Sequence, residues 1–309
     1  MEQRRIGSLE VSVVGLGCNN FGWRIDEEAS AAVVGAALDA GVTFFDTADI
    51  YGRTKSEEFL GRALRGRRRE VIIATKFANR VDDERRGASP AYVRRAVEDS
   101  LRRLGTDYID LYQQHVVDPS VPIADTLGAL NELVGAGKVR EIGCSNFGAR
   151  ELDEAARAVR PGAARFASVQ NEYSLLHREP ELAVLPACAR LGLAFLPYFP
   201  LASGLLTGKV VGGKAPPGSR LADTPRLAAS LSERTLGVVD ALAAYATSRG
   251  HTLLELAFAW LLAHPPVASV IAGATTPAQV RANAQAAGWV LSGPELAAVE
   301  RLAPPPDAP

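Results

Sequence analysis

Four side chains within the first 115 residues have the chemistry needed to place a proton on an oxygen atom. Asp46 and Lys76 each end a run of apolar residues, Tyr51 follows the first run, and His115 follows a third. Tyrosine is a poor acid at neutral pH, but a nearby ammonium stabilises its phenolate and lowers its ordinary pKa of about 10. A histidine can hydrogen-bond a carbonyl and support negative charge on its oxygen. The combination predicts reduction of a carbonyl group.

Lys76 is the least ordinary of the four. It ends the apolar run Val71–Thr75, which is typical of an interior strand, and it is one of only five lysines in the chain. A buried ammonium is costly unless it is paired, so it requires an anionic neighbour. Asp46, at the end of the preceding run, is the expected partner. A lone aspartate after a strand is usually a turn or cap residue, so the prediction depends on the joint placement of all four.

The composition excludes several classes of protein. The chain has 309 residues, 47% hydrophobic and 22% charged, with a formal net charge of −1. A charge this small predicts no attraction to nucleic acid or to an anionic membrane. Three unpaired cysteines indicate a reducing compartment, and no signal peptide or apolar stretch of membrane-spanning length is visible. We therefore expect a cytoplasmic protein. The histidines lack ligand-like spacing, so no metal is expected.

Apolar runs typical of strands alternate with stretches that have helical periodicity. Strands buried on both faces predict parallel pairing through helical crossovers. A doubly wound sheet and a closed barrel both fit this alternation, but eight units without a domain-splitting linker favour the barrel. The predicted strands are 13–17, 43–46, 71–76, 108–114, 139–144, 167–170, 194–198 and 269–271, and the predicted helices are near 27–40, 55–65, 90–104, 122–136, 149–159, 181–191, 252–263 and 277–286.

The fold prediction is therefore α/β, a (β/α)8 TIM barrel forming one domain over residues 1–309. Residues 4–12 predict a β-hairpin that precedes the barrel. The glycine- and proline-rich segment 205–231 is too long for an ordinary connection, which predicts a functional loop. An extra helix is expected over 232–249. The proline-rich tail 303–309 is expected to be disordered.

Several segments resemble those of the aldo-keto reductase superfamily, whose members include the beta subunits of voltage-gated potassium channels. The resemblance runs in the family's order from the amino-terminal hairpin to residue 287. It implies a (β/α)8 barrel, a nicotinamide dinucleotide held without a Rossmann fold, and catalysis by Asp46, Tyr51, Lys76 and His115, with Tyr51 as proton donor. The segments that carry it are Asp46–Gly52, Ala74–Lys76, Asp110–His115, Gly143–Phe147, Gln170–Tyr173, Tyr198–Gly204 and Ile271–Gly273.

The same resemblance implies a set of residues that contact the cofactor. Ser145, Asn146 and Gln170 are expected at the nicotinamide carboxamide, and Tyr198 against the nicotinamide ring. The pyrophosphate and adenosine are expected to meet Pro200, Leu201, Ser203, Gly204, Leu205, Gly273, Thr275, Gln279 and Asn283, with Lys209 and Arg220 folded over them from the long loop. Thr276 followed by Pro277 independently predicts a helix N-terminus suited to an anion.

The chain departs from the better-known members at the adenosine end. Some of them carry a lysine where Gly273 stands and others an arginine where Thr275 or Gln279 stands. Each of these cations serves the 2′-phosphate of NADP in those members. Lys209 or Arg220 is expected to compensate, so NADP is the predicted cofactor and NAD the alternative.

The substrate is expected to be a small carbonyl compound, an aldehyde or a ketone. Its pocket should be apolar or aromatic, with contacts from Trp23, Ile25, Phe77, Val116 and Phe199. A regulatory subunit that binds cofactor with little turnover is the first alternative, and a barrel hydrolase or isomerase is the second. The second would need clustered histidine and acidic ligands at several strand ends. The oligomeric state and the identity of the substrate do not follow from the sequence.

Overall fold

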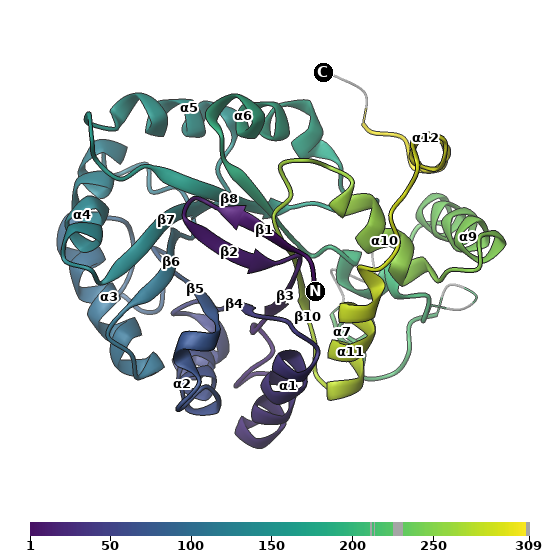
Figure 1. The fold of residues 1–309 in the computed structure, drawn as a ribbon, viewed down its shortest axis with the longest axis horizontal. Helices are drawn as coiled ribbons and strands as arrows, with labels where there is room; N and C mark the ends of the chain where they lie inside the picture. Colours follow the sequence, from purple (N-terminus) through teal and green to yellow (C-terminus); the bar gives the residue numbers. More distant parts are fainter. Residues whose placement is uncertain (211, 213, 225–230, 307–309) are drawn as a thin grey trace.

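The computed structural model describes all residues except 211, 213, 225–230 and 307–309. Its main feature is a ring of parallel strands surrounded by helices (Figure 1). The strand order places β10 beside β3 and then runs in sequence to β9, as in the predicted barrel. The strands are β3 (Val14–Gly17), β4 (Phe44–Asp46), β5 (Ile72–Phe77), β6 (Ile109–Gln114), β7 (Val139–Ser145), β8 (Phe166–Glu172), β9 (Ala194–Tyr198) and β10 (Val270–Gly273).

The ring closes between β9 and the residues just before β10. The Phe195 N–H donates to the Pro266 carbonyl at 2.7 Å, and the Ala268 N–H donates to the Phe195 carbonyl at 3.0 Å. Together with the pairing of β10 and β3, these bonds leave no open sheet edge at the seam. The carboxyl ends of all eight strands therefore meet on one face, where active sites of such barrels form.

The opposite end of the ring is covered by an antiparallel hairpin of β1 (Gln3–Ile6) and β2 (Leu9–Ser12). In Figure 1 it lies across the middle of the ring. Its side chains Ile6, Leu9 and Val11 are fully buried among interior residues such as Phe44 and Leu111. The hairpin thus closes the inner core, and the predicted hairpin is confirmed.

The helices form an outer layer whose apolar faces pack on the strands. Because side chains alternate along a strand, Ile73 and Phe77 point to the helices while Ala74 and Lys76 point inside the ring. The helices that follow the strands are α1 (Glu27–Asp39), α2 (Lys55–Ala63), α3 (Pro90–Leu104), α4 (Ile123–Gly135), α5 (Ala149–Ala158), α6 (Val184–Leu191), α10 (Leu253–Leu262) and α11 (Pro277–Ala286).

Helix boundaries follow the capping residues of the sequence. The Ser89 side chain accepts a hydrogen bond from the Tyr92 N–H at the start of α3. Gly105 ends that helix with φ +65°, a conformation that other residues rarely adopt. Helix α6 is shorter than predicted, because Ala183 is not helical and a 3-10 turn, η3 (Glu179–Leu182), precedes it.

Further helices lie outside the eight repeating units. The predicted extra helix is present as α9 (Glu233–Ser248), whereas α12 (Gly293–Leu302) was not predicted. The sequence does contain a signal for the start of α12, since Ser292 and Glu295 form a capping box around Pro294. Ala303, the first residue of the predicted tail, is buried, so the packed chain continues at least that far. Residues 307–309 of that tail lie outside the described residues.

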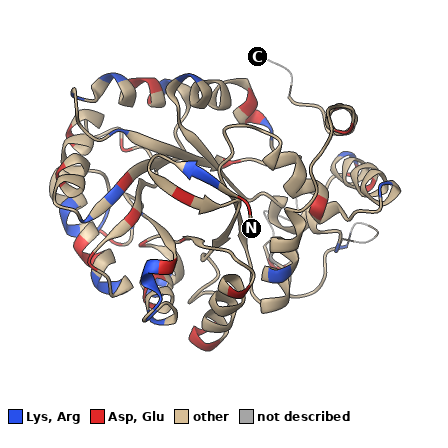
Figure 2. Cartoon of the chain, in the orientation of Figure 1, with Lys and Arg blue, Asp and Glu red and all other residues tan. Residues whose placement is uncertain are grey.

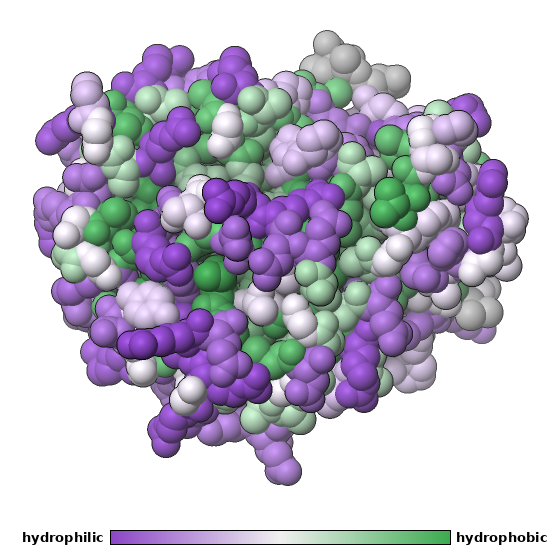
Figure 3. All heavy atoms as spheres, in the orientation of Figure 1, coloured by the Kyte–Doolittle hydropathy of each residue, from purple (hydrophilic) through white to green (hydrophobic). Residues whose placement is uncertain are grey.

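The surface mixes charges of both signs. Lys, Arg, Asp and Glu alternate on the outer helices in Figure 2, and polar residues surround smaller apolar groups on the face in Figure 3. Many of the charges are paired across neighbouring helices, as Arg94 with Glu132 and Arg62 with Glu27. Among the described helices, none is both long and apolar enough to cross a bilayer.

A buried arginine joins the last helix to the rest of the fold. The Arg178 guanidinium donates to both carboxylate oxygens of Glu181 at 2.7 Å and also bonds to Glu300 of α12 and the Ala303 carbonyl. The Trp260 indole N–H donates to Glu300 at 3.0 Å. Arg178 is 4% exposed, so these bonds are shielded from water. The pairing holds α12 against the barrel.

Replacing Arg178 by methionine should lower the free energy of unfolding by about 1.5–3 kcal/mol, because the partly buried carboxylates of Glu181 and Glu300 lose a charged hydrogen-bond partner. The matched control is Arg190→Met, which removes an arginine from an exposed pair with Asp153 and should cost less than about 1 kcal/mol. Urea unfolding of both variants measures the difference. Equal losses in the two would show that Arg178 does not anchor the helix.

Candidate active site

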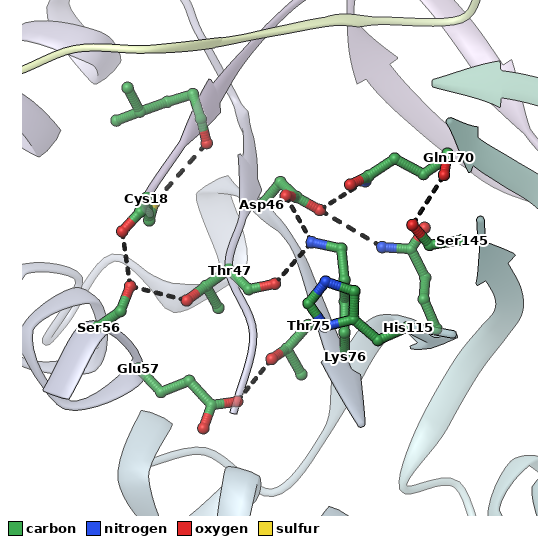
Figure 4. Close-up of polar contacts among 12 residues, drawn as sticks. Cys18, Asp46, Thr47, Ser56, Glu57, Thr75, Lys76, His115, Ser145 and Gln170 are labelled. Atoms are coloured by element: carbon green, nitrogen blue, oxygen red, sulfur yellow. Dashed lines mark hydrogen bonds and ion pairs between the residues drawn. The ribbon is translucent and has the colours of Figure 1, made fainter. Parts of the chain in front are cut away.

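The predicted ion pair between Asp46 and Lys76 lies at the carboxyl ends of β4 and β5. The Lys76 ammonium donates to Asp46 Oδ2 at 2.6 Å and to the Thr47 carbonyl at 2.9 Å (Figure 4). Lys76 is fully buried and Asp46 is 3% exposed. Burial by itself lowers the pKa of a lysine, but Asp46 and Tyr51 outweigh it and raise the pKa of Lys76. The lysine is therefore a fixed positive charge.

Tyr51 lies above this ion pair, at the start of a 3-10 turn, η1 (Tyr51–Thr54). The Lys76 ammonium is 5.2 Å from the centre of the Tyr51 ring. The ring also meets the His115 imidazole edge to face, with centroids 5.8 Å apart. The structure thus gathers the four side chains that the sequence separates by almost seventy residues.

His115 follows β6. Its backbone N–H donates to the Phe77 carbonyl at 2.8 Å, and this bond holds the residue beside the end of β5. Burial, and secondarily the Lys76 ammonium, lowers the pKa of His115 to about 3. The imidazole is therefore neutral at physiological pH. A neutral ring can donate a hydrogen bond to a carbonyl without adding a second positive charge beside Lys76.

A cavity of about 930 Å³ opens over this group at the carboxyl ends of the strands. A volume of that order is at the upper end for small-molecule sites. Asp46, Tyr51 and His115 form its wall at one end, while Lys76 lies beneath the wall. The predicted cofactor residues on the wall are Ser145, Asn146, Gln170, Tyr198, Pro200, Leu201, Ser203, Gly204, Lys209, Gly273, Thr275, Gln279 and Asn283.

A hydrogen-bond network connects the ion pair to the predicted carboxamide site. Asp46 Oδ1 accepts from the Gln170 side-chain amide at 2.9 Å, and the Ser145 hydroxyl donates to the Gln170 carbonyl at 2.7 Å. The Asn146 amide donates to the His115 carbonyl at 2.9 Å, and the Tyr198 hydroxyl donates to Asn146 at 2.9 Å. The side chains that would orient a nicotinamide are thereby locked to the four central residues.

The backbone after β9 bends sharply along the cavity. Phe199, Ala202 and Ser203 have φ of +51°, +45° and +58°, values that are strained for residues other than glycine. Gly204 follows with φ +114°. Successive backbone N–H groups in such conformations form concavities that bind anions. This segment therefore suits the pyrophosphate that the sequence predicted there.

The far end of the cavity is formed by the N-terminus of α11. Thr276 is its N-cap and Pro277 occupies the first turn, as predicted. Gln279 Oε1 accepts from the Thr275 N–H at 2.7 Å and from its hydroxyl at 3.1 Å. Those bonds leave the Gln279 amide group as a donor. A helix N-terminus with such donors can hold a phosphate or a ribose.

Arg24 binds the long loop after β9 where that loop lines the cavity. The sequence analysis did not identify this residue. The Arg24 guanidinium donates to the Gly218 carbonyl at 2.5 Å and pairs with Asp223 at 3.1 Å. Asp223 belongs to the short helix α7 (Arg220–Asp223). Arg220, predicted to cover the cofactor, begins this helix, and its side chain lies outside what the structure describes.

Four predicted contact residues do not lie on the cavity wall. Phe77 is fully buried and stacks on Tyr112 with centroids 4.8 Å apart, because it points outward from β5 when Lys76 points inward. Leu205 is buried in the outer core, and Ile25 and Val116 pack against that core. Trp23 and Phe199, predicted for the substrate pocket, do line the cavity, and Trp23 is 59% exposed.

One interior residue was missed. Gln113 lies on β6 inside the ring, and its amide donates to Asp46 at 3.4 Å. Strand alternation could have identified it, because it lies two residues before His115. Within the described part of the chain, no group of three or more histidine, cysteine, aspartate or glutamate side chains could hold a metal ion.

Comparison with known proteins agrees with this geometry. The family model described as Aldo/keto reductase family matches residues 13–304. "Aldo-keto reductase YhdN" of Bacillus subtilis is 38% identical over 92% of this chain and 87% of its own length. "Probable aldo-keto reductase 1" of Glycine max is 37% identical over 96% of this chain and 86% of its own. The solved structure of "aldo-keto reductase AKR11C1 from Bacillus halodurans (holo form)" has a TM-score of 0.82 at 33% identity, covering 98% of this chain and 96% of its own.

Gly52 offers a test of how tightly the Tyr51 turn is held. A Cβ atom there would lie 2.1 Å from the Phe21 carbonyl oxygen, and φ is +57°. Gly52→Ala should therefore lower the free energy of unfolding by about 1–3 kcal/mol. Gly128→Ala, in an open position of α4, should raise it by about 0.5–1 kcal/mol. Urea unfolding gives both values. An unchanged free energy of unfolding in Gly52→Ala would mean that the turn is loosely held.

Proposed function

Because the chain belongs to the aldo/keto reductase family, we propose that it reduces an aldehyde or ketone with NADPH, with Tyr51 as the general acid. Membership in this family makes the chain an oxidoreductase. The observation that carries the finer proposal is the buried Asp46–Lys76 pair directly beneath Tyr51 and beside a neutral His115.

The four residues divide the work of protonating a carbonyl oxygen. We place that oxygen between the Tyr51 hydroxyl and the His115 ring, which hydrogen-bonds and orients it. Tyr51 donates its proton to the oxygen, and the Lys76 ammonium stabilises the phenolate that remains. Asp46 holds Lys76 charged and in place. Tyr51 then regains a proton from solvent.

The cavity fits a nicotinamide dinucleotide, which when bound supplies the hydride. Asn146 and Gln170 would hold its carboxamide, and the Tyr198 ring would lie against the nicotinamide. The strained segment at Ser203 and Gly204 would receive the pyrophosphate. The hydrogen bonds among Asp46, Gln170 and Ser145 support this assignment, since they orient the amide before any ligand arrives.

The preference for NADP rests on the charges of the cavity wall. Its described cations are Arg24 and Lys209. Arg24 is already engaged by Asp223 and Gly218, whereas Lys209 has no ion pair within the described chain. Lys209 is therefore the proposed partner of the 2′-phosphate. The cavity wall also carries the apolar side chains of Trp23, Ile50 and Phe199, which favour an uncharged substrate.

Replacing Tyr51 by phenylalanine removes the proposed acid and leaves the ring. We expect turnover with NADPH and a panel of aldehydes and ketones to fall by about 10²–10⁴-fold, with the Kd for NADPH unchanged. Tyr245→Phe, on α9 and remote from the cavity, is the control and should retain full turnover. Unchanged rates in Tyr51→Phe would contradict the role of Tyr51. Tight NADPH binding by the native protein without turnover of any carbonyl would instead indicate a regulatory subunit.

Lys209→Gln tests the cofactor preference. A charged hydrogen bond to phosphate is worth about 1.5–3 kcal/mol, so KM for NADPH should rise by about tenfold or more while KM for NADH stays constant. Lys214→Gln changes a lysine of the same loop that does not line the cavity, and it should alter neither value. Equal effects on NADPH and NADH would show that Lys209 does not contact the 2′-phosphate.

A further inference from the structure

Asp49 is a buried acid that the proposed reaction does not use. It lies two residues before Tyr51, on the strand-to-turn segment that carries the catalytic tyrosine, and is 3% exposed. Within the described chain, neither of its carboxylate oxygens makes a hydrogen bond of normal geometry. Its backbone N–H donates to the Lys76 carbonyl at 3.2 Å, so the segment is tied to the ion pair. An unpaired buried carboxylate is costly when charged.

The charges around Asp49 are already paired with other groups. Glu57 of α2 is fully buried, accepts from the Thr75 hydroxyl at 2.6 Å (Figure 4) and pairs with Arg103 of α3 at 2.6 Å. Lys76 of β5 is neutralised by Asp46. The remaining titratable neighbours are Tyr92 of α3 and Tyr112 of β6, both uncharged at neutral pH. No free cation of the described chain is therefore left for Asp49.

Burial and the Glu57 carboxylate raise the pKa of Asp49 to about 7, against opposing effects of Arg103, the Ile50 backbone and Lys76. The unfolded chain would titrate near the ordinary value for aspartate. Protonation of Asp49 therefore stabilises the fold fully below about pH 4. This contribution is lost progressively as the pH rises to about 7, and above that it no longer changes.

We propose that Asp49 is a positioning residue for Tyr51, which in its neutral form holds the segment 47–54 in place and on ionisation releases it. An ionised Asp49 would be repelled by the buried Glu57 carboxylate and would have no hydrogen-bond donor within the described chain, and movement of the segment toward water relieves both costs. Tyr51 lies on that segment and moves with it. The proposal rests on the proposed function, since it gives the reductase an upper pH limit set outside the catalytic group.

The test compares the native protein with Asp49→Asn, which mimics the neutral acid at every pH. Asp153→Asn removes a surface carboxylate paired with Arg190 and serves as control. Hydrogen–deuterium exchange of peptides covering 47–54 is measured from pH 6 to 8.5 and corrected for the intrinsic rate. Unfolding midpoints from pH 4 to 8.5 and kcat/KM from pH 6 to 8.5, with NADPH and an aldehyde, are measured on the same samples.

We expect protection of 47–54 to fall about tenfold between pH 6 and 8.5 in the native protein and in Asp153→Asn, but not in Asp49→Asn. The kcat/KM should fall through about pH 7 in the same two proteins only. Relative to Asp49→Asn, the native midpoint should decline from pH 4 to 7 and then level off. Identical pH dependence of protection in all three proteins would overturn the proposal. Exchange and midpoints do not require turnover, so an inactive protein would overturn the proposed function alone.

Discussion

The ion pair between Asp46 and Lys76 is the constraint around which the catalytic end of the barrel is organised. An ammonium without contact with water is tolerable only because a carboxylate lies 2.6 Å away and a backbone carbonyl accepts a second hydrogen bond. Both residues sit at the ends of neighbouring parallel strands, whose pairing fixes the distance. Loss of either partner would leave an unpaired charge in the interior.

From this pair, contacts reach both parts of the proposed reaction. On one side, Lys76 lies beneath Tyr51, and on the other, Asp46 holds Gln170 at the proposed carboxamide site. Gln113 also donates to Asp46 from inside the ring. One carboxylate thus orients Gln170 at the proposed carboxamide site directly and the proposed proton donor Tyr51 through Lys76. Such preorganisation lets a site stabilise developing charge without rearranging when the reaction occurs.

The segment between Asp46 and Tyr51 has residues on both sides of the strand layer. Asp46 points into the ring, while Asp49 is buried toward the helices beside Glu57. The segment is therefore held from within by a paired charge and from outside by an acid that is stable only when neutral. On the proposal above, ionisation of Asp49 as the pH rises toward about 7 would loosen this turn, and above that pH its stability would change little further.

The sequence by itself determined the barrel and the ion pair, and its resemblance to the aldo-keto reductases supplied most of the residues of the cavity wall. The local signals are the strand periodicity, the unusual lysine in an apolar run, Lys76, and the capping residues Thr276 and Ser89. Their effects depend on residues that are close together in the sequence. Only the tertiary structure decided which side of a strand each neighbour occupies and which loop residues meet. Phe77 was placed in the pocket although strand alternation turns it outward, and the Arg24–Asp223 contact joins residues almost two hundred positions apart. Contacts between residues so far apart in the sequence depend on how the whole chain folds, which a local sequence pattern does not indicate.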